Sequence, residues 1–119
     1  MDSKFSNAAD FLCKSVAVTI DRLLQSKHPK HGWEYQLNYG FIPDTISPDG
    51  EELDAYIIGT LEPLKKFTGN CIAVIHRLDD NDDKLVVVTD DYLNITDEEI
   101  RQHAHFQEQW FTSEIIRCK

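Results

Sequence analysis

Four carboxylates crowd one short segment of this sequence, Asp49-Gly50-Glu51-Glu52-Leu53-Asp54. Carboxylates held this close repel one another and resist joint ionisation unless a divalent metal or a shared proton neutralises them. The apolar segment Ala55 to Ile58 follows at once, so the acids are expected at the mouth of a strand. Two interpretations are open at this point: a metal site, or the solvated tip of an acidic hairpin.

A second acidic turn, Asp79 to Lys84, leads into the apolar run Leu85 to Val88. If the strands that follow the two turns lie side by side, both sets of acids meet at one end of the sheet. Hard divalent cations such as Mg²⁺ take oxygen ligands from carboxylates, water and substrate phosphates. An EF-hand is excluded, because Asp80, Asp82 and Lys84 break its ligand order and no glycine follows at the required place.

Cations and polar side chains accompany these acids. The loop after a predicted strand is locally basic and suits either an anion site or a solubilising role. Its charged and titratable residues are Lys27, His28, Lys30 and His31. The acids, combined with cations and nearby aromatic and amide groups, suit the binding of a metal-complexed phosphate. Those partners are Arg22, Lys84, Tyr35, Asn38 and Tyr39.

The bulk properties narrow the class of protein. A chain of 119 residues predicts one domain over residues 1–119, with a poorly patterned N-terminus over 1–14. The net charge of -9 argues against nonspecific binding to nucleic acid or to anionic membranes. The odd set Cys13, Cys71 and Cys118 contains no C-x-x-C pair, which predicts reduced thiols and a cytoplasmic location. No apolar stretch has membrane-spanning length, and the N-terminus lacks signal-peptide features.

Several short strands and one helix must position these residues. The pattern predicts strands over 15–22, 55–61, 71–77 and 85–88, and an extended segment over 33–42 with a turn at 38–40. Thr96 followed by Glu99 is a capping box that announces a C-terminal helix. Its apolar face is expected to pack on the sheet, with Trp110 and Phe111 in the core. The fold class is mostly β, a small, mostly antiparallel barrel or open sheet closed by a helix (α+β).

Three segments together resemble the soluble family I inorganic pyrophosphatases. They are Tyr35-x-x-Asn38-Tyr39-Gly40-Phe41-Ile42, Asp49-Gly50-x-x-x-Asp54 and Asp82-x-Lys84-Leu85, in the family's order and approximate spacing. The resemblance covers about Val18 to Val88, and the family's C-terminal helix is matched more loosely by Thr96 to Phe111. The chain looks like a shortened member of that family.

The resemblance implies an OB-type barrel of five strands that hydrolyses pyrophosphate to two phosphates with Mg²⁺, or with Mn²⁺ in its place. The implied metal ligands are Asp49, Asp54, which bridges two ions, Asp82, and one of Asp79 or Asp80. The family aspartate that helps activate the attacking water falls on Glu51, a longer acid, so Glu51 and Asp54 are the implied catalytic residues. The implied phosphate contacts are Arg22, Tyr35 and Lys84.

Two family cations are missing from the sequence. Nothing in the first 14 residues matches the strand that carries a family lysine, and the family's Tyr-Lys pair on the helix falls on Trp110 and Phe111. We hypothesise that Lys27, Lys30, His28 or His31 supplies replacement charge, because their loop follows Arg22 directly.

Two other functions are weighed against the enzyme. One is a noncatalytic or weakly active phosphate or nucleotide binder that keeps the acidic cavity. The other, an OB-barrel that binds single-stranded nucleic acid, is disfavoured by the net charge of -9. The expected partner is a small-molecule phosphate substrate, and the family's habit of forming dimers or hexamers makes a homo-oligomer an expectation.

Overall fold

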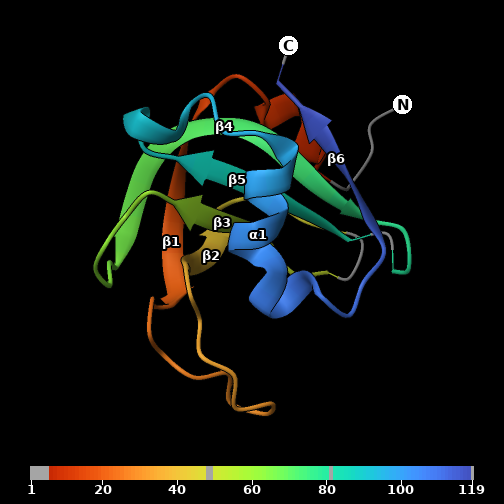
Figure 1. Cartoon of the computed structure of the whole chain (residues 1–119). Helices are drawn as coiled ribbons and strands as arrows, with labels where there is room; N and C mark the ends of the chain where they lie inside the picture. The colour runs from red at the N-terminus through yellow and green to blue at the C-terminus, as the bar shows by residue number, and fades with distance from the viewer. Residues whose placement is uncertain (1–5, 48–49, 81, 119) are drawn as a thin grey trace.

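The computed structural model describes residues 6–47, 50–80 and 82–118, and these form a small barrel with one helix (Figure 1). The barrel strands are β1 (Ser15–Arg22), β2 (Asn38–Ile42), β3 (Leu53–Ile58), β4 (Lys66–Arg77) and β5 (Asp83–Val88). They pair in the order β1-β2-β3-β5-β4, and pairing of β1 with β4 closes the ring. The predicted OB-type barrel of five strands with a C-terminal helix is confirmed.

One parallel pair among these antiparallel strands brings the two acidic turns together. β3 runs parallel to β5, and their register places Asp54 beside Lys84. The strands after the two turns are therefore neighbours, which is the condition under which both sets of acids meet at one end of the sheet. Asp49, the first predicted metal ligand, lies outside the described residues.

The core has two parts that share β3. Val18, Ile57 and Leu85 belong to a cluster contributed by the five barrel strands. The neighbouring side chain Tyr56 instead packs with Ile100 of α1 (Asp97–Glu108), which lies across β3 and β5 in Figure 1. Side chains alternate between the faces of a strand, so a strand covered on both faces is apolar throughout. This explains the unbroken apolar run in β3.

The capping box predicts the start of α1 correctly. The Thr96 Oγ1 accepts from the Glu99 backbone N–H at 3.1 Å, and the Glu99 carboxylate accepts from the Thr96 N–H at 3.1 Å. The helix ends at Glu108, so Trp110 and Phe111 lie in the turn that follows. The prediction that both belong to the core is wrong for Trp110, which is 57% exposed, while Phe111 is half-buried.

The predicted turn at 38–40 is wrong, because these residues open β2. Asn38 is fully buried, and its side-chain oxygen accepts from the backbone N–H groups of Leu24 and Leu64 at 2.9 and 3.2 Å. A Cβ on Gly40 would lie 1.9 Å from the Thr19 carbonyl oxygen of β1. Close approach of two strands, and not a turn, requires this glycine.

A sixth strand was not predicted. β6 (Ser113–Arg117) pairs with β4 outside the barrel. Its residues are half-buried or exposed, so it lacks the apolar run that identifies a core strand. Short turns of 3-10 helix, η1 (Ala8–Phe11) and η2 (Asp90–Tyr92), complete the described elements.

The prediction of three reduced thiols is wrong. Cys13 and Cys118 form a disulfide whose Cα atoms are 5.2 Å apart, and Cys71 is free and buried in the core. The two bonded cysteines are 105 residues apart in sequence, so spacing alone does not reveal the pair. The argument from reduced thiols to a cytoplasmic location loses its basis. None of the described helices combines the length and the apolar character needed to cross a membrane.

Candidate functional site

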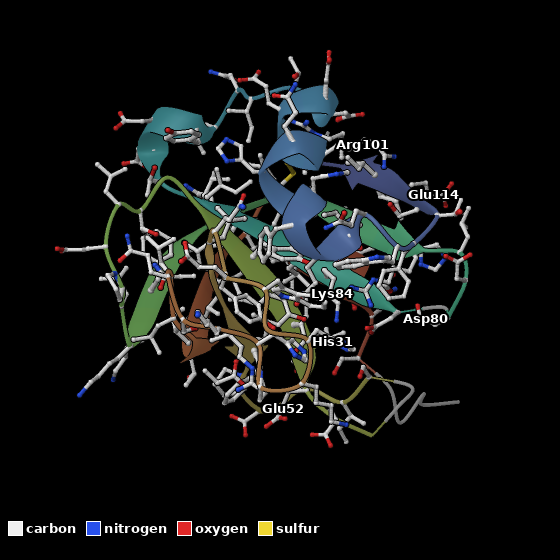
Figure 2. All side chains as sticks on the ribbon, turned by 60° about the horizontal axis from the view of Figure 1, so that its bottom comes forward. His31, Glu52, Asp80, Lys84, Arg101 and Glu114 are labelled. Atoms are coloured by element: carbon white, nitrogen blue, oxygen red, sulfur yellow. A yellow bond between two sulfur atoms is a disulfide. The ribbon has the colours of Figure 1, made fainter. Side chains whose placement is uncertain are left out.

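A cavity of about 450 Å³ collects polar and aromatic side chains at the end of the barrel where the acidic turns lie. Figure 2 shows His31, Glu52 and Lys84 on this same face of the molecule. The residues that line the cavity are Asp21, Arg22, His28, His31, Trp33, Tyr35, Tyr39, Phe41, Glu51, Glu52, Asp54, Arg77, Lys84, Gln107 and Phe111. They come from five strands or their flanking turns, the β1–β2 loop and the end of α1.

Lys84 lies between two of the predicted metal ligands. Its Nζ donates to Asp54 Oδ2 at 2.6 Å and to Asp82 Oδ2 at 2.7 Å, and the residue is 4% exposed. Burial lowers the pKa of Lys84, but the carboxylates of Asp54 and Asp82 outweigh burial and raise it above its ordinary value. Lys84 is therefore a permanent internal cation of the acidic site.

Arg77 is a second buried cation, and the sequence reading did not identify it. Its Nε and Nη2 donate to the two carboxylate oxygens of Glu108 on α1, at 2.9 and 2.6 Å. Tyr56 also donates to Glu108 at 2.5 Å, and the Phe111 ring centre lies 3.7 Å from the guanidinium carbon. Such a bidentate, stacked arginine is held in one orientation. Its third nitrogen, Nη1, lies 3.8 Å from Asp82 Oδ2.

Arg22 and Tyr35 also line the cavity. The Arg22 Nη1 donates to the neighbouring Asp21 carbonyl oxygen at 3.3 Å. Burial raises the pKa of the Tyr35 hydroxyl, and the nearby Arg22 opposes part of that rise. Tyr35 therefore keeps its proton at neutral pH and can donate a hydrogen bond to an anion.

The basic loop presents its histidines to the cavity. Among the described residues that line it, the loop contributes His28 and His31, while Lys27 and Lys30 lie outside the lining. His28 Nδ1 accepts from the Lys30 and His31 backbone N–H groups at 3.0 and 3.1 Å. The pKa of His28 is lowered, mainly by desolvation. The nearby charges of His31, Arg22 and Lys30 lower it further. This histidine is a neutral structural acceptor in the loop.

The remaining predicted acids differ in whether they line the cavity or contact backbone groups elsewhere. Glu51, the predicted water-directing acid, lines the cavity with Glu52 and Asp54. Asp79 is directed elsewhere, because its Oδ2 accepts from the Thr112 N–H at 2.6 Å. Its alternative, Asp80, accepts from the Asp82 N–H at 3.1 Å through Oδ1.

Asp21 is an acid of the cavity that the sequence reading missed. Partial burial raises the pKa of its carboxyl, the adjacent Arg22 opposes the rise and Asp54 adds to it. Its position at the exposed end of the alternating strand β1, one residue before Arg22, was the available signal.

Two of the predicted metal ligands therefore converge in the structure, namely Asp54 and Asp82. Within the described ranges, no group of three or more acidic, histidine or cysteine side chains is arranged to hold a metal ion. The carboxylate oxygens that are present have the chemistry of Mg²⁺ ligands. Lys84 neutralises both of them.

Known proteins resemble this chain in sequence and in fold. The sequence model of the inorganic pyrophosphatase family matches residues 10–116. An inorganic pyrophosphatase of Rickettsia typhi is 31% identical over 97 residues, which are 78% of this chain and 52% of that protein. One from Haemophilus influenzae is 44% identical over 59 residues, covering 45% of this chain and 33% of that protein. The chain spans about half the length of the curated relatives with the longest matches, 52% to 54%.

The fold is shared with solved inorganic pyrophosphatases. The crystal structure of an inorganic pyrophosphatase from Ehrlichia chaffeensis superposes with a TM-score of 0.69 at 19% identity, covering 98% of this chain and 92% of that one. The family match includes the barrel strands, α1 and nearly all of β6. The chain belongs to the inorganic pyrophosphatase family.

Proposed function

We propose that this protein hydrolyses inorganic pyrophosphate to two phosphates with Mg²⁺, or with Mn²⁺ in its place. The single observation that carries the proposal is the convergence of Asp54 and Asp82 on Lys84. Asp54 and Lys84 line a cavity that also contains Arg22. The carboxylates can bind a metal cation, and the cations of the cavity can neutralise phosphate oxygens. Phosphoryl transfer requires both. A small-molecule phosphate substrate, with no nucleic-acid or membrane partner, agrees with the net charge of -9.

The donor set fits a hard divalent cation. Asp54 and Asp82 would hold the ion, and we propose that Asp49 completes the set. Asp79 keeps its predicted place in the set only if it exchanges its contact with Thr112 for the metal. When bound, such an ion would supply Lewis-acid catalysis at the phosphate and would help to activate the attacking water.

The chain's own residues then perform distinct tasks. Glu51 orients the attacking water and accepts its proton at the carboxylate. Arg22 and Lys84 neutralise the charge that develops on the phosphate oxygens, and the protonated Tyr35 hydroxyl donates to one of them. Lys27 and Lys30 lie outside the cavity lining, and their proposed role is to attract the anionic substrate. A homo-oligomer, as in the resembled family, is part of the proposal.

Release of phosphate from pyrophosphate, with and without Mg²⁺, tests this function. We expect Asp54→Asn to lower kcat/KM by at least about a hundredfold, because it removes a charged ligand at the reacting phosphate. Asp90→Asn, at an exposed acid on η2, is the matched control and is expected to retain wild-type activity. Equal inertness of the wild type and Asp54→Asn would sink the enzyme proposal and leave a phosphate binder.

A further inference from the structure

An aromatic stack borders the cavity of about 450 Å³ described above, called here the phosphate cavity, and is not explained by pyrophosphate hydrolysis. The His31 and Trp33 rings stack at 4.8 Å with an interplanar angle of 10°. Trp33 in turn stacks on Trp110 at 4.7 Å and 25°. Trp33 comes from the β1–β2 loop and Trp110 from the turn after α1, so two distant segments build one stack of His31, Trp33 and Trp110 rings, called here the aromatic shelf.

The aromatic shelf has its own cavity, which joins the phosphate cavity. A space of about 460 Å³ is lined by His31, Trp33, Trp110 and Phe111. Of these four, His31, Trp33 and Phe111 also line the phosphate cavity. A ligand could therefore place its anionic end in the phosphate cavity and a ring in the cavity beside the shelf. It would extend through both spaces without any opening of the barrel.

Core packing does not account for Trp110 in the shelf. Trp110 is 57% exposed although its partner Trp33 packs against the core cluster under α1. A large aromatic side chain held in place by stacking, with more than half of its surface in water, offers a face to another flat group. Every nucleobase has such a face, and stacking on aromatic side chains is the usual way in which proteins hold unpaired bases.

We infer that the aromatic shelf binds the base of a nucleoside diphosphate or triphosphate whose phosphoanhydride enters the phosphate cavity. This rests on the proposed function, since the same groups act on the anhydride. Water attacks the terminal phosphorus, the P–O bond to the bridging oxygen breaks, and the products are orthophosphate and a nucleotide shorter by one phosphate. The water proton goes to Glu51, and the bridging oxygen leaves with the shortened nucleotide. The net charge of -9 favours a single nucleotide over a nucleic-acid strand.

Intrinsic fluorescence provides a direct test, because both tryptophans of the chain lie in the aromatic shelf. Titration of the wild type with ADP in Mg²⁺ is expected to quench tryptophan emission, whereas titration with pyrophosphate leaves it nearly unchanged. Calorimetry measures the affinities of the wild type and of Trp110→Ala for both ligands. The variant should lose about tenfold more affinity for ADP than for pyrophosphate, which is the loss expected for one stacking contact. Trp110→Phe keeps a stacking ring and should restore most of the ADP affinity.

Leu61→Ala is the matched control, because Leu61 is 89% exposed and outside both cavities. Pyrophosphate hydrolysis without ADP quenching, or equal losses for both ligands in Trp110→Ala, would overturn the shelf and leave the proposed function standing. ADP quenching in a wild type that hydrolyses neither ligand would overturn the proposed function and support the shelf as a binding site.

Discussion

The side chain of Lys84 lies between the carboxylates of Asp54 and Asp82 and separates their charges. Lys84 is bonded to Asp54 and Asp82 and is nearly excluded from water. Buried charges of this kind are tolerated because each is paired, and removing one member leaves the others uncompensated. Lys84 therefore allows the two acids to be held close together.

Replacing Lys84 by Met should make folding stability depend on the metal. We expect Lys84→Met to lower the free energy of unfolding by about 3 kcal/mol in EDTA, because Asp54 and Asp82 lose their shared cation. Mg²⁺ should restore part of that loss by taking the place between the carboxylates. Urea denaturation with and without Mg²⁺ measures both effects. Lys65→Met, at an exposed lysine, is the control and should change neither value, and equal Mg²⁺ effects in both variants would contradict the prediction.

Alkaline pH should destabilise the protein through three buried groups of the site. Burial raises the pKa values of Tyr39 and Tyr56 well above 10.0, and the carboxylates beside Lys84 outweigh burial and raise its pKa above 10.5. All three groups hold their protons more tightly folded than unfolded, so their stabilisation is complete below about pH 10 and is lost as the pH rises further. Each group contributes a slope of up to about 1.4 kcal/mol per pH unit.

Urea titrations between about pH 9 and pH 11.5 measure this slope. Tyr39→Phe removes one of the titrating groups, so its profile should be flatter above pH 10 than that of the wild type. A free energy of unfolding that rises with pH in this window would contradict the assignment of signs.

The residues of the site were predictable to different degrees. Asp54, Asp82 and Lys84 were found because two acidic turns lead into apolar runs and match motifs of the resembled family, and both signals are local in the sequence. Arg77 was missed, since its partner Glu108 is 31 residues away and meets it only when α1 packs on the barrel. Asp79 follows the pattern of a ligand, but the hydrogen bond to the Thr112 N–H directs it away from the acids.

At the scale of elements, the contact between β1 and β2 depends on the absence of a side chain. We expect Gly40→Ala to lower the free energy of unfolding by about 3 kcal/mol or more, because its Cβ would collide with the Thr19 carbonyl. Gly32→Ala is the matched control, since nothing lies within 4 Å of that Cβ and only its φ of +77° is unfavourable, at about 1 kcal/mol. Thermal melting of the two variants compares them, and equal losses would contradict the prediction.

The same glycine explains why part of the element pattern was misread. Asn followed two residues later by Gly is typical of a turn. In the structure the buried Asn38 side chain accepts hydrogen bonds from two separate loops, and Gly40 lies in a strand. Both residue types serve turns and close backbone contacts, and local sequence does not separate the two uses. β1, β5 and α1 were predicted well because their periodicity or capping residues are local signals.

At the scale of the molecule, the disulfide joins the two ends of the described chain. Reduction should lower the free energy of unfolding by about 4 to 5 kcal/mol, because a bond between Cys13 and Cys118 restricts the unfolded chain over 105 residues. Denaturation with and without dithiothreitol measures the loss. The double variant Cys13→Ser, Cys118→Ser should unfold at the reduced protein's midpoint under both conditions, and sensitivity of this variant to reductant would refute the explanation.

The disulfide also changes the connectivity of the protein. From Cys13 to Cys118 the main chain and the bond form a closed covalent ring that contains all six strands and α1. A single protease cut in the β1–β2 loop would open this ring without releasing a fragment until a reductant is added. The ring also makes the chain a candidate for circular permutation, with new termini placed in that loop, because the Cα atoms of Cys13 and Cys118 are already held 5.2 Å apart.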